Sequence, residues 1–187
     1  KNNSSEVLDI KAKYFSDEDI IFNLTNSNDV DYFSYVFNAS NAGKFFKLLK
    51  FNSEVQDGIL SSEGYIGNLD NDNEIMGTLS IDDFKIMKAP IFAELLLAAS
   101  LTGLIDVLNN DGIDFEQFDA QFTGKENIYN ITKSRAYGLS LGLTGKGIIN
   151  NNNNSLDIEG SIIPAYKINS LFNNIPVIGE LLAGEED

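Results

Sequence analysis

The feature that most constrains the fold of this chain is an alternation of apolar and polar residues with a period of two. It is clearest in residues 8–14, where leucine, isoleucine, alanine and tyrosine alternate with aspartate and lysine. Residues 20–24 and 139–143 repeat the pattern. This period predicts β-strands with one apolar and one polar face, as in antiparallel sheets. Polar hairpin loops are expected between strands at residues 68–74, 123–127 and 150–155.

Two of the predicted strands change phase partway along. Their apolar positions move from odd to even numbers between Ile81 and Phe84, and again between Phe115 and Phe118. We expect a β-bulge at residues 82–83 and another at 116–117, because one extra residue swaps the faces of a strand. Since bulged hairpins curve a sheet, the expected fold class is mainly β. It is an extended, curved antiparallel sheet of roughly ten strands, open like a trough or half-pipe.

Residues 91–109 break the strand pattern and predict one main apolar helix. Pro90 suits its first turn, and Asn109, Asn110 and Gly112 are expected to close it. The apolar arc of this helix is about twice the roughly 100° that one-sided packing needs, so we expect burial on two sides. The second side would face groove lipid or a membrane. The candidates for these contacts are Phe92, Leu95, Leu96, Leu97, Leu101 and Leu104.

A second apolar element is expected near the end of the sequence, at residues 168–182. Pro176 and Gly179 lie inside it, which favours short helical turns over one continuous helix. Its candidates for lining a groove or contacting a membrane are Leu171, Phe172, Val177 and Ile178.

The residue types exclude several classes of chemistry. The chain has no histidine and no cysteine, so Ser-His-Asp and Cys-His arrangements and zinc sites built on cysteine are impossible. Residues 70–74 faintly resemble a calcium loop but lack its turn glycine and distal glutamate, so a solvated hairpin tip is expected there. We therefore expect no catalytic residue, no metal and no cofactor.

The net charge of −15 limits the possible partners. It repels phosphate backbones, so nucleic acid is not expected to bind. It also gives no attraction to anionic lipid headgroups, so any contact with lipid or membrane must be apolar. Polar residues interrupt every apolar run before the roughly 18 residues of a membrane span. We interpret the sequence, which begins at Lys1, as a fragment, and we expect any targeting signal to lie outside it.

Several ordered motifs resemble the C-terminal region of the AsmA-like proteins of the YhdP type. Residues 77–84 (GTLSIDDF) are followed by Ala89, Pro90 and the apolar helix, and residues 101–108 (LTGLIDVL) lead into residues 112–115 (GIDF). The most specific motif is residues 160–169 (GSIIPAYKIN), continued by residues 175–182 (IPVIGELL). The motif positions are Pro90, Gly112, Gly160, Pro164, Tyr166, Asn169, Pro176 and Gly179.

The resemblance divides the chain into two parts. Residues 1–36 match only as generic strands continuing from upstream repeats, whereas residues 37–187 resemble the AsmA-like C-terminal region as one β-rich unit. In that family the sheet continues past this point with another strand. The resemblance implies a periplasmic bridge in the envelope of a Gram-negative bacterium, anchored to the inner membrane by a segment outside this sequence. Its apolar groove would conduct phospholipid towards the outer membrane, serving outer-membrane biogenesis, with other envelope proteins as possible partners.

Two other readings stay open from the sequence. The chain could be a structural or interaction module of the envelope, whose apolar faces form a closed core and carry no lipid. An enzyme is the third hypothesis, and the absence of histidine and cysteine argues against it. Ordinary core packing is the simplest role for any single hydrophobic residue named above.

Overall fold

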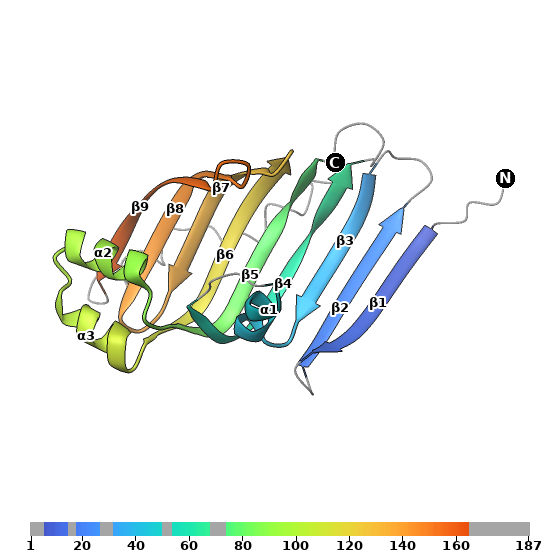
Figure 1. Cartoon of the computed structure of the whole chain (residues 1–187). Coiled ribbons are helices and arrows are strands. Elements are labelled where there is room, and N and C mark those ends of the chain that lie inside the picture. Colours follow the sequence, from blue (N-terminus) through green and yellow to red (C-terminus); the bar gives the residue numbers. More distant parts are fainter. Residues whose placement is uncertain (1–5, 15–17, 27–31, 50–53, 68–73, 165–187) are drawn as a thin grey trace, which may run out of the picture.

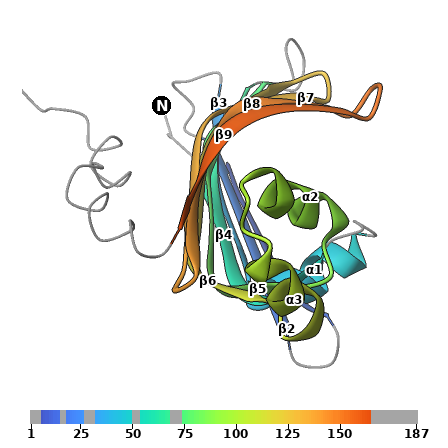
Figure 2. The same ribbon diagram turned by 90° about the vertical axis from the view of Figure 1, so that its left-hand side faces the viewer.

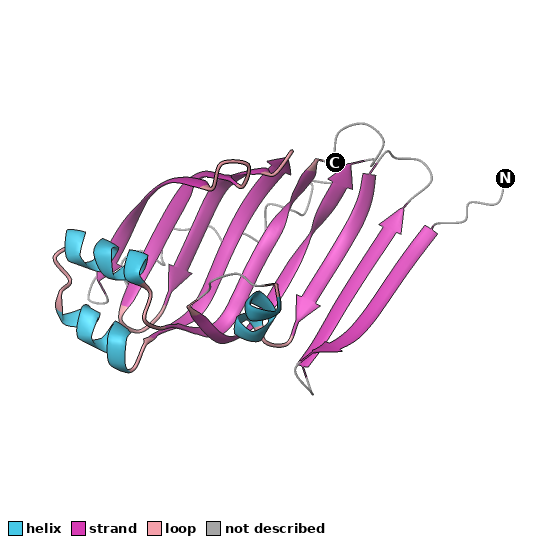
Figure 3. Ribbon diagram, in the orientation of Figure 1, coloured by secondary structure: helices cyan, strands magenta, loops and turns pink. Residues whose placement is uncertain are grey.

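The computed structural model describes residues 6–14, 18–26, 32–49, 54–67 and 74–164, and in these residues the chain is mainly β (Figures 1 and 3). Nine strands form one sheet in sequence order, and each pairs antiparallel with the next. The strands are β1 (Glu6–Tyr14), β2 (Glu18–Asn26), β3 (Tyr32–Ala39), β4 (Val55–Gly67), β5 (Ile75–Ile86), β6 (Ile113–Lys125), β7 (Ile128–Tyr137), β8 (Leu141–Asn150) and β9 (Ser155–Pro164). The predicted fold class, an open and curved antiparallel sheet, is confirmed.

Three short helices lie on the concave side of the sheet (Figure 2). They are α1 (Ala42–Leu48), between β3 and β4, and the pair α2 (Pro90–Ala98) and α3 (Gly103–Asn110), between β5 and β6. Viewed along the long axis in Figure 2, β6 to β9 curve around this side, so that the sheet has the shape of a trough. We call the concave side, which carries the helices, the inner face, and the opposite side the outer face.

The single helix predicted over residues 91–109 is wrong, because the chain forms two helices there. Ser100 takes a left-handed φ of 60°, which ends α2. The Leu101 N–H donates to the Leu96 carbonyl at 2.8 Å, and the Ser100 N–H donates to the Leu97 carbonyl at 3.0 Å. This is the Schellman pattern of a helix end, formed here around serine although glycine is usual at this position. The sequence therefore lacked the residue that normally marks such a stop.

Both predicted ends of this helical region are confirmed. Pro90 occupies the first turn of α2, where its missing N–H costs nothing. At the other end Gly112 takes a φ of 80°, and its N–H donates to the Val107 carbonyl at 2.7 Å. A β-carbon at position 112 would lie 2.7 Å from the Lys85 side chain, so both conformation and space require glycine there.

The two predicted phase changes are present, but the predicted bulges at residues 82–83 and 116–117 are wrong. Ile81 and Phe84 are three residues apart and both are buried, as is Phe115. Ile81 pairs with Phe118 and Phe84 pairs with Phe115, so neither strand carries an extra residue. Instead the backbone of β4 and β5 turns together at this level, with left-handed φ at Asp57, Gly58 and Asp83. We call this part of the sheet, which contains Asp57, Gly58, Asp83 and the paired Phe84 and Phe115, the crease.

The register shifts occur elsewhere, in the strands that curve most in Figure 2. One lies between Gln121 and Phe122 in the pairing of β6 with β7. The other lies between Ile131 and Ser134 in the pairing of β7 with β8. Thr132 is thus an inserted residue of β7, and such an insertion bends and twists a strand.

Helix α1 is tied to the start of the sheet by buried hydrogen bonds. The Tyr14 hydroxyl, at the end of β1, donates to the Asn41 carbonyl at 2.6 Å and accepts from the Asn41 N–H at 3.0 Å. The Asn41 side chain caps the helix by accepting from the Lys44 N–H at 2.9 Å. Lys44 also forms an ion pair with Glu18 on β2. These contacts fix α1 over β1 to β4 by polar groups as well as apolar ones.

Three predictions about the organisation of the chain remain predictions. The boundary drawn between residues 36 and 37 falls inside β3, and the sheet runs across it without interruption. The helical turns expected within residues 168–182 and the hairpin tip at residues 70–73 lie outside the described residues.

Candidate functional site

The candidate site is the inner face of the trough. The pairing register arranges its side chains in three rows that cross all nine strands. Row 1, nearest the helices, contains Ala12, Ile20, Ala39, Leu60, Ile81, Phe118, Ala136, Leu143 and Ile162. Row 2 contains Ile10, Phe22, Phe37, Ser62, Leu79, Ala120, Ser134, Gly145 and Gly160. Row 3 contains Leu8, Leu24, Tyr35, Gly64, Gly77, Phe122, Ile131, Gly147 and Ile158.

No residue in the three rows carries a charge, although 22% of the chain consists of charged residues. Strands lie about 4.8 Å apart and alternate residues of a strand about 7 Å apart. The rows therefore form an apolar band about 38 Å long and about 14 Å wide. Because the two register shifts leave the apolar positions facing inwards, the band passes through the curved β7 to β9 without a break.

Helices cover one margin of this band and make a closed core there. In row 1 Ala39 is fully buried and Leu60 is 2% exposed. At the crease, beyond row 1, the Phe84 and Phe115 rings stack at 5.2 Å, and Phe92 of α2 meets Phe115 edge-on at 6.1 Å. This part of the inner face has the close packing of a protein interior.

Row 3 is open at every strand except β3, where Tyr35 is 5% exposed, whereas in row 2 Phe37 and Leu79 pack against the core. Leu8 is 48% exposed and Ile158 is 43% exposed, at the two ends of row 3. Between them Leu24, Phe122 and Ile131 are partly exposed, and none of these three belongs to the buried cluster or to the residues packed against it. An apolar surface of this length facing solvent is unusual for a soluble domain and marks a binding surface.

The hydroxyl groups on the inner face are satisfied within the protein. Ser62 donates to the Thr78 carbonyl at 2.7 Å, so the Tyr35 hydroxyl, 3.1 Å from the Ser62 oxygen, is the donor in that pair. Burial raises the pKa of the Tyr35 hydroxyl above its ordinary value. The Tyr35 oxygen lies 2.4 Å from where a β-carbon of Gly77 would stand, so glycine there leaves room for the ring. The surface that these groups present to the trough is therefore apolar.

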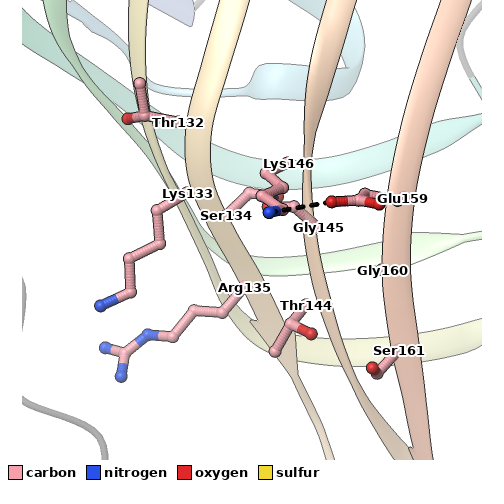
Figure 4. A pocket seen from close by; sticks show the side chains of 10 residues that line it. All are labelled: Thr132, Lys133, Ser134, Arg135, Thr144, Gly145, Lys146, Glu159, Gly160 and Ser161. Atoms are coloured by element: carbon pink, nitrogen blue, oxygen red, sulfur yellow. Dashed lines mark hydrogen bonds and ion pairs between the residues drawn. The ribbon is translucent and has the colours of Figure 1, made fainter.

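The outer face carries several ion pairs, together with exposed hydrophobic side chains such as Val36, Tyr65 and Met76. A hollow of about 600 Å³ lies over β7 to β9, and Figure 4 shows the side chains around it. Its basic groups include Arg135, which pairs with Asp119 at 3.0 Å, and Lys146, which pairs with Glu159 at 2.8 Å. The Lys146 ammonium lowers the pKa of the Glu159 carboxyl. These charged side chains alternate along the strands with Ser134, Gly145 and Gly160 of row 2, which also line the hollow.

The helix residues predicted to contact lipid or a membrane differ in their burial. Leu96 is fully buried and Phe92 is 8% exposed, whereas Leu95 is 48% and Leu97 is 59% exposed. Leu101 and Leu104 are partly buried against the core. Within the protein α2 is therefore buried on one side only, and the contact of its second side with groove lipid or a membrane stays a prediction.

The motif positions are only partly described. Gly160 lies in β9, where a β-carbon would stand 2.0 Å from the Thr144 carbonyl oxygen, so the close approach of β8 requires glycine. Pro164 ends β9. The other predicted residues of the C-terminal element and motif, Tyr166, Asn169, Leu171, Phe172, Pro176, Val177, Ile178 and Gly179, lie outside the described residues.

The sequence reasoning placed the groove contacts on the helices and missed the strand residues that make up the band. Phe22, Leu24, Phe122 and Ile131 are the clearest of these. The period-two pattern contained the signal, because it predicts which residues of each strand share a face. It does not tell which part of that face the helices leave open.

Two searches of the described residues gave negative results. No group of three or more aspartate, glutamate, histidine or cysteine residues is placed to hold a metal ion. None of the helices in this part of the chain has the length and apolar character needed to cross a bilayer.

The fold and the inner face together define a class of protein: an open antiparallel β-trough whose inner surface carries an uncharged band. Comparison of the chain with protein-family models, curated proteins and solved structures gives no match. The AsmA-like family therefore remains a resemblance carried by the sequence motifs.

Proposed function

We propose that this chain is a segment of a bridge that conducts phospholipid along the inner face of the trough. The observation that carries the proposal is the uncharged band across all nine strands, whose row 3 is open at every strand except β3. Moving acyl chains into water costs about 0.8 kcal/mol per methylene, so a lipid with some thirty methylenes faces a barrier of about 24 kcal/mol. A continuous apolar surface removes most of that barrier and needs no catalytic residue, metal or nucleotide.

The setting of this bridge follows from the sequence resemblance. In that setting the protein is AsmA-like, lies in the periplasm of a Gram-negative bacterium and is anchored to the inner membrane outside this sequence. Its lipid would move between the inner and outer membranes. The exposed Leu95 and Leu97 of α2 give the chain apolar groups for contact with a membrane, which its net charge of −15 would otherwise disfavour.

The test is lipid binding by matched charge variants of β6. Phe122→Arg places a charge in row 3, whereas Thr123→Arg places the same charge on the neighbouring outer-face position. We expect wild type and Thr123→Arg to co-purify with phospholipid, identified by mass spectrometry, and to crosslink to a photoactivatable acyl chain. Phe122→Arg should lose most of both signals while keeping its β-sheet circular dichroism, because a charge in hydrocarbon is costly.

The alternative is a structural or interaction module of the envelope that carries no lipid. The closed packing at the crease supports it, since part of the inner face is already ordinary core. Wild-type protein that binds no phospholipid, or equal lipid binding by the two arginine variants, would favour this alternative over a conducting groove.

A further inference from the structure

Helix α2 contacts the rest of the protein through apolar groups. Its buried side chains are Phe92, which meets the Phe115 ring, and Leu96. Among the described residues, no hydrogen bond or ion pair joins a side chain of α2 to another element. Even its N-cap, Ala89, makes no side-chain hydrogen bond.

Helix α1 covers the same face in a different way. Asn41 caps it, the Tyr14 hydroxyl binds both backbone groups of Asn41, and Lys44 pairs with Glu18. Hydrogen bonds are directional and costly to leave unmade in a buried place, so they hold α1 in one position. Apolar contacts are non-directional and can be exchanged for others of the same kind, so nothing comparable fixes α2.

Two strained backbone positions flank α2. Lys88, before the helix, has a φ of 56°, and Ser100, after it, has a φ of 60°. Neither is glycine, so both residues are held in a conformation that their side chains disfavour. One hydrogen bond joins the first position to α3, from the Lys88 N–H to the Leu108 carbonyl at 3.0 Å. A change of φ at these two residues would swing α2 as a unit.

We propose that α2 is a movable lid, which occupies part of the apolar inner face until an acyl chain replaces it. The inference rests on the proposed lipid-binding function and adds a means of regulating it. The surface under α2, around Phe115, borders row 1, so an acyl chain lying in the band reaches the lid from its side. When the lid opens, the apolar contacts between α2 and the sheet are replaced by apolar contacts between the acyl chain and the sheet. Only the fraction of the protein with the lid open is then competent to bind lipid at this place.

Local opening can be measured with a single thiol, because the chain contains no cysteine. Leu96→Cys places a thiol under the lid, and Leu60→Cys places one in row 1 on β4, where the wild-type side chain is 2% exposed. If α2 opens independently of global unfolding, a maleimide should label position 96 roughly tenfold or more faster than position 60. Equal labelling rates, in two variants of similar stability by urea unfolding, would overturn the lid.

The link to lipid is tested by loosening each helix with the same substitution. Phe92→Ala removes the ring that anchors α2, and Phe45→Ala removes a ring of α1 that packs on Phe37 at 5.0 Å. The probe is phosphatidylcholine with a fluorescent acyl chain, offered in phosphatidylcholine vesicles. We expect Phe92→Ala to take up the probe roughly fivefold faster than wild type, and Phe45→Ala to show no gain.

The outcomes separate the lid from the function on which it rests. Wild-type protein that takes up no probe contradicts the proposed function, and the lid falls with it. Uptake by wild type that Phe92→Ala does not accelerate overturns the lid alone. If Phe92→Ala does not fold, the labelling rates at positions 96 and 60 decide the question, because those variants keep the anchoring ring.

Discussion

The two parts of the inner face, one covered by helices and one open, are built from the same sequence pattern. At the covered margin Leu60, Ile113 and Leu141 are no more than 2% exposed, whereas Leu8 and Ile158 at the ends of row 3 are more than 40% exposed. Strand type, pairing and side-chain polarity do not distinguish these parts. The difference teaches that alternation produces an apolar face, and that only the helices laid on it turn part of that face into a core.

The largest expected effect is at the covered part, under α2. Leu96→Ala should lower the free energy of unfolding by about 2–5 kcal/mol, because it leaves a cavity beneath the helix. The matched control is Leu97→Ala, at a side chain that is 59% exposed, which should change stability by less than about 0.5 kcal/mol. Urea unfolding of the two variants measures both values, and similar losses would mean that α2 is not oriented as described.

A second prediction concerns the polar anchor of α1. Tyr14→Phe removes the hydroxyl that binds the Asn41 carbonyl and N–H, and leaves both groups buried without that partner. We expect a loss of about 1–3 kcal/mol in the free energy of unfolding. Hydrogen exchange should show faster opening of α1 with little change in α2. Equal loosening of both helices would contradict the contrast drawn between them.

A smaller effect is expected in the open part. Leu24→Ala removes a partly exposed side chain of row 3 that lies outside the buried cluster. Because it was never fully withdrawn from water, the stability loss should be about 1 kcal/mol, well below that of Leu96→Ala. Chemical unfolding checks the value. A loss as large as at position 96 would show that the band is closed core at β2.

The smallest effect is a pH dependence at the exposed ion pair between α1 and β2. The hydrogen bond from Lys44 lowers the pKa of the Glu18 carboxyl in the folded protein. The unfolded state therefore binds more protons, and the stabilisation is complete above the ordinary carboxyl pKa and lost as the pH falls through the lower folded value. Glu18→Gln should remove this small stabilisation at pH 7, and its stability should then fall less steeply than that of wild type below about pH 4.5. An unaltered pH profile would show that the pair contributes nothing.

Much of the fold could be predicted because local pattern decides it. The alternation in residues 8–14 and 20–24 gave β1 and β2 with the correct inner residues, and Pro90 and Gly112 gave the ends of the helical region. The break at Ser100 was missed because serine rarely takes the left-handed conformation that ends α2. The conformation there depends on how α2 and α3 fold back on the sheet, and that is a tertiary effect.

The crease is a second feature that the sequence pattern predicted only in part. The change of phase between Ile81 and Phe84 was visible in the sequence, and both residues are buried in the structure. A bulge was the simplest cause for one strand considered alone. The structure instead turns β4 and β5 together through Asp57, Gly58 and Asp83 and keeps their register. A concerted turn of neighbouring strands cannot be inferred from either strand by itself.

The sequence by itself determined that this protein is an antiparallel sheet with one mainly apolar face, because alternation has the period of a strand and needs no distant contact. It also determined, through the absence of histidine and cysteine, which chemistry the chain cannot perform. Only the tertiary structure decided where the helices lie on that face, that Leu96 points inwards and Leu97 outwards, and how much of the band stays open. The physical reason is that a side chain is buried only when another element packs on it. The sequence of one strand or helix specifies its own apolar surface but not which element covers it.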